Sequence, residues 1–124
     1  MLKKKKFKNV HITEKIALFY LRLKGYHLLK KNFTVKNGTG AGEIDLIMRK
    51  GKTIVFVEVK KRKTYLLAAQ SIDMNNQIRI VKSSAVFLQR YPQYNSYNMR
   101  YDAVLFKDKS FWPKHLIDAW RILW

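Results

Sequence analysis

The sequence predicts an α/β protein in which helices flank one mixed β-sheet. Residues 10–25 and 74–91 repeat apolar side chains at the three- and four-residue spacing of a helix. Residues 42–60 read as two apolar strands around a Lys-Gly-Lys turn, and residues 99–106 alternate like a strand. A strand, a crossover helix and a further strand normally form a right-handed parallel unit. The order of the elements therefore predicts a sheet with both antiparallel and parallel neighbours.

The first helix is expected over residues 10–25, where Gly25 is well placed to end it. Its side chains form two stripes at helical spacing. The larger stripe consists of Ile12, Ile16, Phe19, Tyr20 and Leu23, and the smaller one of Glu14, Ala17, Leu18 and Leu21. The helix is therefore expected to be covered on two sides, with Glu14 leading the smaller stripe.

Three strands and a second helix are expected next. Residues 26–37 form a first strand, which the turn-forming residues 37–42 end. The next two strands pair as a hairpin across residues 49–52. The second helix is closed by Pro92. Its apolar positions at helical spacing are Ile78, Val81, Ala85 and Leu88.

Two further segments complete the predicted order. Residues 99–106 form a strand, and residues 114–120 form a short edge strand or a helical turn. The order is therefore α-β-β-β-α-β(-β). A chain of 124 residues, 48% of them hydrophobic, can bury one core. We expect residues 1–9 to be a basic N-terminal tail and residues 10–124 to fold as a single domain.

Basic residues greatly outnumber acidic ones. The chain has 26 Lys and Arg against 8 Asp and Glu, which gives a formal net charge of +18. Such a charge repels itself unless a polyanion or counterions neutralise it, so nucleic acid is the first partner to consider. A basic surface typical of a Lys-rich proteome is an alternative, and the Lys run at residues 3–6 also permits attachment to anionic lipid. Charge by itself does not select among these.

The composition limits the chemistry that is available. The sequence has no cysteine, which excludes disulfides, thiolate metal sites and thiol nucleophiles. Any metal must bind oxygen or imidazole, and His11, His27 and His115 show no metal-ligand spacing. The sequence has neither the apolar core of a signal peptide nor an 18-residue apolar run. We therefore expect a cytoplasmic protein with no membrane partner.

Acidic side chains stand among the apolar residues of the predicted hairpin. On a strand, residues two apart share a face, so Glu58 and Lys60 continue the face of Ile54 and Phe56. Asp45 lies on the preceding strand, and the hairpin can bring it beside Glu58. Clustered carboxylates repel each other, and a poorly paired ion in a site of low dielectric costs several kcal/mol. A positive charge is therefore expected among these acids.

Two kinds of positive charge fit this cluster. Basic side chains can pair with Glu43, Asp45 and Glu58 at the strand ends, which is a purely structural arrangement. A divalent metal is the alternative, because Mg²⁺ takes one or two protein carboxylates, keeps several waters and adds substrate phosphate oxygens. Lys60 would then orient or deprotonate the attacking water, or stabilise charge in the transition state, while the metal polarises the scissile phosphate. The second arrangement predicts phosphodiester hydrolysis.

Five segments from Glu14 to Trp120 carry a specific pattern. They are TEKIALFYLRLKGYHLLKKN, GEIDLIMRKGKTIVFVEVKKR, QIRIVKSSAVFLQ, MRYDAVLF and HLIDAW. In content and order they resemble the YraN-like family of small bacterial proteins. The resemblance implies a restriction-endonuclease-like fold of the PD-(D/E)xK superfamily, similar to archaeal Holliday junction resolvases, with a central mixed sheet flanked by helices.

The resemblance also implies a set of functional residues. The helix acid of the family pattern matches Glu14, its aspartate matches Asp45, and its E-x-K pair matches Glu58 and Lys60. The three acids are thereby implied as ligands of Mg²⁺ or Mn²⁺, and together with Lys60 as the catalytic set. For Glu14 a structural alternative stays open, because an acid in the first turn of a helix is stabilised by the helix dipole without any catalytic role.

Two positions depart from the family pattern. Gln77 stands where the family usually has a lysine that opens the second long helix, and Thr13 stands where glycine is typical. Gln77 can hydrogen-bond water or phosphate, but it cannot neutralise charge. The residues expected to contact nucleic acid are Lys60, Lys61, Arg62, Lys63, Gln77 and Arg79.

The sequence leaves two functions open. The first is a metal-dependent endonuclease that hydrolyses DNA, branched or single-stranded, in repair or recombination. The alternative, which Gln77 favours, is a non-catalytic basic nucleic-acid-binding module that retains the nuclease fold. A symmetric homodimer is a further expectation by analogy with resolvases, because a four-way junction presents two equivalent cleavage sites.

The remaining polar and aromatic residues have mostly structural interpretations. Asp102 is expected to form an ion pair with Arg100. Several aromatic side chains are able to stack on unpaired bases, and core or interface packing explains most of them. These are Trp112, Trp120, Trp124, Tyr91, Tyr94, Tyr97 and Tyr101.

Overall fold

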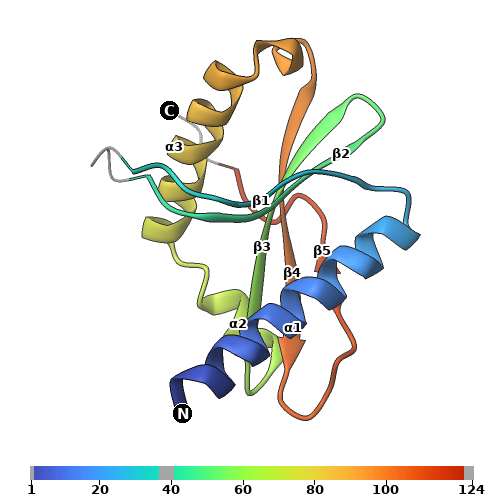
Figure 1. The fold of residues 1–124 in the computed structure, drawn as a ribbon, viewed down its shortest axis with the longest axis vertical. Helices are drawn as coiled ribbons and strands as arrows, with labels where there is room; N and C mark the ends of the chain where they lie inside the picture. Colours follow the sequence, from blue (N-terminus) through green and yellow to red (C-terminus); the bar gives the residue numbers. More distant parts are fainter. Residues whose placement is uncertain (1, 37–40, 122–124) are drawn as a thin grey trace.

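The computed structural model describes residues 2–36 and 41–121, and of residues 2–11 the backbone alone. Its elements are α1 (Leu2–Leu23), β1 (His27–Phe33), β2 (Ile44–Lys50), β3 (Thr53–Arg62), α2 (Tyr65–Gln70), α3 (Met74–Arg90), the 3-10 turn η1 (Pro92–Tyr94), β4 (Asn98–Lys107) and β5 (Lys114–Leu116) (Figure 1). The predicted order is confirmed, and α2 is an additional short helix between β3 and α3.

The strands form one mixed sheet. Within the described residues it has five strands in the order β1-β2-β3-β4-β5. Strands β3 and β4 are parallel and are connected through α2 and α3, and the other neighbouring pairs are antiparallel. Helix α1 packs on one face of the sheet, and α2 and α3 pack on the other (Figure 1). This is the predicted α/β architecture, and it is consistent with a restriction-endonuclease-like fold.

The face of α1 that meets the sheet is the smaller of the two predicted stripes. Ala17 and Leu21 are fully buried against apolar residues of β2, β3 and β4. The larger stripe is mostly in solvent, with Phe19 64% and Leu23 72% exposed. The expectation that both sides are covered was wrong, because in the described part of the chain the sheet supplies a buried face on one side of α1 only.

The buried face of α3 also differs from the predicted one. Ile80, Ser83, Ser84 and Phe87 are buried. The four predicted apolar positions are half-buried or exposed: Ile78, Val81, Ala85 and Leu88. Two serines replace apolar residues on the buried face because their hydroxyl groups find partners there. Ser83 Oγ donates to the Gly42 carbonyl, and Ser84 Oγ lies 2.7 Å from the Tyr101 hydroxyl.

Element ends differ from the predicted ones in three places. Helix α1 begins at Leu2, so residues 2–9, which were predicted to be a tail, belong to it. The first strand ends at Phe33, and the predicted turn at residues 37–42 lies mostly outside the described residues. The segment at 114–120 forms an edge strand, β5, as one of its two predicted alternatives.

Across residues 2–36 and 41–121, no helix combines the length and the apolar character needed to span a membrane.

Candidate functional site

A cavity lies where the start of β2, the second half of β3 and the first turns of α3 meet. Its volume is about 260 Å³. It is lined by Gly42, Glu43, Asp45, Glu58, Lys60, Asn76, Arg79 and Ile80. Three carboxyl groups and two basic side chains thus share one small space, on the α3 side of the sheet.

The hairpin of β2 and β3 sets the positions of Asp45 and Glu58. The antiparallel register pairs Leu46 with Val57, and its continuation places Asp45 opposite Glu58. Both side chains enter the cavity, because residues directly opposite in an antiparallel pair project to the same face. The Val59 backbone N–H donates to Asp45 Oδ2 at 2.7 Å, which fixes this carboxyl group against β3.

The Asp45 carboxyl group binds a proton more readily than an ordinary aspartate does. Burial raises the pKa of Asp45 well above its usual value, and a hydrogen bond with Glu58 and repulsion by its charge raise it further. The Val59 N–H and the Lys60 ammonium act in the opposite direction and do not overcome these effects. The pair therefore favours a shared proton, or another positive charge, between its oxygens.

Lys60 supplies a positive charge at the edge of this pair. Its Nζ lies 3.9 Å from Glu58 Oε2, with the Lys60 side chain 26% exposed and that of Glu58 only 9% exposed. The two residues share a face because they are two apart on β3. The ammonium group is therefore positioned to hold a water molecule or a phosphate oxygen beside the carboxylates.

Glu43 and Glu14 are joined by one amide group. With its carboxamide nitrogen turned toward the acids, Asn32 donates to Glu43 Oε1 at 3.0 Å and to Glu14 Oε1 at 2.9 Å. Burial, and then the charge of Asp45, raise the pKa of Glu43. Asn32 has φ of 50°, a left-handed conformation that asparagine tolerates better than most residues.

Glu14 does not line the same cavity as Asp45 and Glu58. It lines a smaller neighbouring pocket, with Leu46 of β2 at one wall. It also lies far from the first turn of α1, so stabilisation by the helix dipole does not explain it. Three carboxyl groups line the larger cavity, but among the residues whose side chains the structure describes no three acidic or imidazole groups lie close enough together to hold one ion. The structure thus brings Asp45, Glu58 and Lys60 together, and it links Glu14 to them through Asn32 and Glu43.

Helix α3 contributes one basic and one amide side chain to the cavity. Arg79 and Asn76 are three residues apart on the helix and line the same wall. Gly42 holds α3 close to the sheet, because its N–H donates to the Arg79 carbonyl at 3.2 Å. A side chain at Gly42 would meet Arg79 Cβ at 3.0 Å. Arg79 is therefore held at the cavity because α3 directly contacts Gly42, just before β2.

The other predicted nucleic-acid contacts lie outside the cavity. The Gln77 side chain donates to the Ile72 carbonyl at 3.0 Å and is half-buried. Lys61 is half-buried and Arg62 is exposed at the end of β3, and Lys63 is exposed just beyond it. These three basic residues follow Lys60 directly, so they extend the positive charge from the cavity along the end of the strand.

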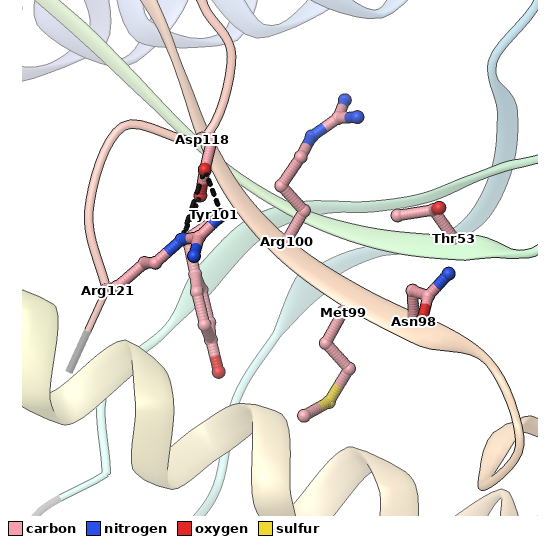
Figure 2. A pocket seen from close by; sticks show the side chains of 7 residues that line it. All are labelled: Thr53, Asn98, Met99, Arg100, Tyr101, Asp118 and Arg121. Carbon is pink, nitrogen blue, oxygen red and sulfur yellow. Dashed lines mark hydrogen bonds and ion pairs between the residues drawn. The ribbon is translucent and has the colours of Figure 1, made fainter. Parts of the chain in front are cut away.

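A second cavity, of about 460 Å³, lies at the start of β4. Its carboxyl group, Asp118, forms an ion pair with Arg121 at 2.7 Å (Figure 2). The hydrogen bond from Arg121 lowers the pKa of Asp118. Arg100 points away from this pair in Figure 2. Among the described residues that line it, this larger cavity has no pair of carboxylates like that of the first one, so the first is the better candidate for chemistry.

Asp102 forms the structural ion pair that the sequence predicted. Arg100 donates to both of its oxygens at 2.8 and 2.9 Å, and His115 Nε2 lies 2.7 Å from Oδ2. Burial would raise the pKa of Asp102, but the hydrogen bonds from His115, Arg100 and the Asp118 N–H hold it below its usual value. Asp102 is fully buried and its charge is satisfied, which identifies it as a structural residue.

Sequence reasoning missed part of this arrangement. It grouped Glu43 with Asp45 but gave Glu43 no role in the site, and it did not consider Asn32 or Asn76. The sequence did contain a signal for Asn76, because it lies three residues before Arg79 on the predicted helix and therefore shares a face with it. The sequence contained no such signal for Asn32, because its two partners, Glu14 and Glu43, come from segments far apart in the sequence.

The sequence matches a known protein family over most of its length. Residues 13–106 match the model of "Uncharacterised protein family UPF0102". The chain is 42% identical over 111 residues to UPF0102 protein amb4503 of Paramagnetospirillum magneticum, covering 90% of this chain and 85% of that protein. It is 40% identical to a UPF0102 protein of Parvibaculum lavamentivorans, with 88% and 78% covered. It is 42% identical to one of Janthinobacterium sp., with 83% and 81% covered. The chain belongs to the UPF0102 family, the YraN-like family that its sequence motifs resemble.

Proposed function

We propose that this protein is a metal-dependent nuclease that hydrolyses phosphodiester bonds in DNA, branched or single-stranded. The observation that carries the proposal is the meeting of Asp45 and Glu58 in one cavity, with Lys60 3.9 Å from Glu58. The net charge of +18 supports nucleic acid as the partner.

The donor set in the cavity fits a divalent cation such as Mg²⁺ or Mn²⁺. Mg²⁺ commonly binds to one or two carboxylates, retains waters and completes its shell with substrate phosphate oxygens. Burial and the facing Glu58 carboxyl group raise the pKa of Asp45, so a cation between the two carboxyl groups would stabilise their charged forms. When bound by Asp45 and Glu58, the cation would supply Lewis-acid polarisation of the scissile phosphate.

The remaining side chains have distinct roles in this proposal. Lys60 holds the attacking water or stabilises the negative charge that develops in the transition state. Its ammonium group lies beside Glu58 and is partly open to solvent. Arg79 at the cavity wall binds phosphate oxygens through its planar guanidinium. Lys61, Arg62 and Lys63 bind the backbone further along the strand.

Glu14 acts on the cavity from outside in this proposal. The amide of Asn32 holds Glu14 and Glu43 together, so Glu14 positions Glu43 at the cavity wall. The family resemblance implies Glu14 as a third metal ligand. In the arrangement described here its effect reaches the carboxylate pair through Asn32 and Glu43, which makes it a positioning residue.

The test is a substrate panel under three ionic conditions. Labelled four-way junction, flap, single-stranded and duplex DNA are incubated with Mg²⁺, with Mn²⁺ and with chelator. We expect cleavage with the metals only, and its loss in Asp45→Asn, while Asp118→Asn in the other cavity keeps it. Cleavage in chelator, or equal cleavage by wild type and Asp45→Asn, would contradict the proposal.

A nucleic-acid-binding module without catalysis is the second candidate. It is favoured by the absence, among the described side chains, of three converging metal ligands, and by the engagement of Gln77 with the Ile72 carbonyl. The same panel separates the two candidates. Binding that falls steeply with salt, together with no turnover on any substrate in either metal, selects the binding module.

A further inference from the structure

Two exposed aromatic side chains lie beyond the C-terminal end of β4, in the segment that leads to β5. Phe111 is 60% exposed and Trp112 is 74% exposed, whereas Trp120 is buried in the core. Adjacent large apolar side chains in solvent often mark a binding surface. These two rings play no part in the core, so they are available to a partner.

The segment that carries the rings is attached to the body of the protein. The Tyr65 hydroxyl of α2 donates to the Trp112 carbonyl at 2.8 Å. The Trp112 N–H donates to Ser110 Oγ at 3.1 Å, and the following Pro113 is buried. The backbone of this segment is therefore held in place while its two rings face solvent.

Lysine side chains lie at the Phe111 ring and at the ring of Tyr65, whose hydroxyl group binds the Trp112 carbonyl. Lys61 Nζ lies 5.8 Å from the centre of the Phe111 ring. Lys107 and Lys114 place their Nζ atoms 5.4 and 5.6 Å from the centre of the Tyr65 ring. Residues 107–114 contain three lysines and one acid, Asp108. The aromatic surface is therefore positively charged, which matches a polyanion that carries flat rings of its own.

Strand β3 connects this surface to the carboxylate cavity. Glu58 and Lys60 line the cavity, and the next residue, Lys61, contacts Phe111. Three residues of a strand span roughly 10 Å at about 3.3 Å each. Lys60 and Lys61 are neighbours and project to opposite faces of β3, so a flexible nucleic-acid strand with one phosphate at Lys60 reaches Phe111 and Trp112 by passing around the end of β3.

We propose that Phe111 and Trp112 stack on unpaired nucleobases, so that the protein selects nucleic acid with a single-stranded segment beside the phosphate in the cavity. In a duplex the base faces are already stacked on one another, whereas an unpaired base has a free face for an aromatic side chain. Phosphate contacts by lysines do not distinguish these forms. For its effect on cleavage, the inference rests on the proposed nuclease function.

A protein partner is the competing occupant of this surface. Exposed Leu66 and Leu67 of α2, 66% and 46% exposed, would extend an apolar contact. The lysines at Phe111 and Tyr65 favour nucleic acid, because each would have to lose its hydration in an apolar interface.

The test compares two oligonucleotides that carry the same phosphates. Binding of the full chain to oligothymidylate and to an abasic strand of equal length is measured by fluorescence anisotropy in chelator. We expect wild type to bind oligothymidylate at least about fivefold more tightly. The double variant Phe111→Ala/Trp112→Ala should bind both strands with the affinity that wild type has for the abasic one. Phe19→Ala, which removes an aromatic ring 64% exposed on α1, should keep the preference.

Two results would overturn the inference. One is equal affinity of wild type for the two strands, as expected if the surface serves a protein partner. The other is a preference for bases that persists in the double variant with an unchanged melting temperature. Neither result depends on catalysis, since the binding is measured without metal. A separate cleavage assay in Mg²⁺ then reports on the nuclease function, where the double variant should lose the preference for single-stranded over duplex DNA.

Discussion

The carboxyl groups of Asp45 and Glu58 lie opposite each other on antiparallel strands, with Lys60 at their edge and the Val59 N–H bound to Asp45. Two carboxyl groups in one partly buried cavity are stable when they share a proton or hold a cation between them. This relationship makes the cavity a candidate for chemistry, and it has consequences for stability that are measurable without any substrate.

Asp45→Asn should stabilise the metal-free protein at neutral pH. Because folding raises the pKa of Asp45, the native state is favoured most at pH values below the ordinary aspartate pKa of about 3.9 and loses stability as the pH rises through the raised value. Asparagine removes this loss, and its carbonyl oxygen can still accept from Val59. We expect a gain of roughly 1 kcal/mol at pH 7, and none at pH 3.5, in thermal unfolding with chelator. Destabilisation at pH 7 would argue against a strained carboxyl pair.

Asp102→Asn should have the opposite effect. Hydrogen bonds hold the pKa of Asp102 below its usual value, so its contribution is present above about pH 3.9 and disappears as the pH falls through the lowered value. Removal of one partner from this buried ion pair with Arg100 should cost about 3 kcal/mol at pH 7. Chemical denaturation of wild type and variant at pH 7 measures the cost. An unchanged free energy of unfolding would mean that a neutral amide can take the place of the Asp102 carboxylate beside Arg100.

Lys60→Gln should reduce the cleavage rate about 100-fold at saturating DNA, because the ammonium group acts on the water or on the developing charge. Affinity for DNA in chelator should change little, since one phosphate contact among many is lost. Lys63→Gln is the matched control, because Lys63 is exposed beyond the end of β3. Similar rate losses in both variants would show that Lys60 contributes only general positive charge.

The strand part of the site could be predicted from short-range rules. Residues two apart on a strand share a face, which places Lys60 beside Glu58. The tight turn after Lys50, with φ of +57° at Gly51, sets the register that brings Asp45 opposite Glu58. Both rules act over a few residues, so the sequence contains the information that they need.

The buried face of α3 could not be predicted in the same way. Apolar spacing favoured Ile78 and Val81 on α3, but Ser83 and Ser84 are buried instead. A serine hydroxyl is tolerated in a core when a partner accepts its hydrogen bond, and here the partners are the Gly42 carbonyl and Tyr101. Such partners are fixed by tertiary packing, which periodicity does not show.

The bridge between Glu14 and Glu43 was also beyond sequence reasoning. It depends on Asn32, whose left-handed backbone near the end of β1 turns one amide toward acids from α1 and from the start of β2. No local sequence pattern indicates that an asparagine will bridge two acids in this way. The family resemblance implied a role for Glu14, but it did not indicate that this role would pass through an asparagine.

Calorimetric titration of the protein with Mn²⁺ tests the central claim most directly. In two buffers of different ionisation enthalpy, we expect wild type to bind Mn²⁺ with release of a proton at pH values below the raised pKa of Asp45, because the cation displaces the proton from this carboxyl group. Glu58→Gln and Asp45→Asn should each abolish this binding, and Asp118→Asn should not. Absence of Mn²⁺ binding by wild type, or binding that both cavity variants retain, would contradict the account.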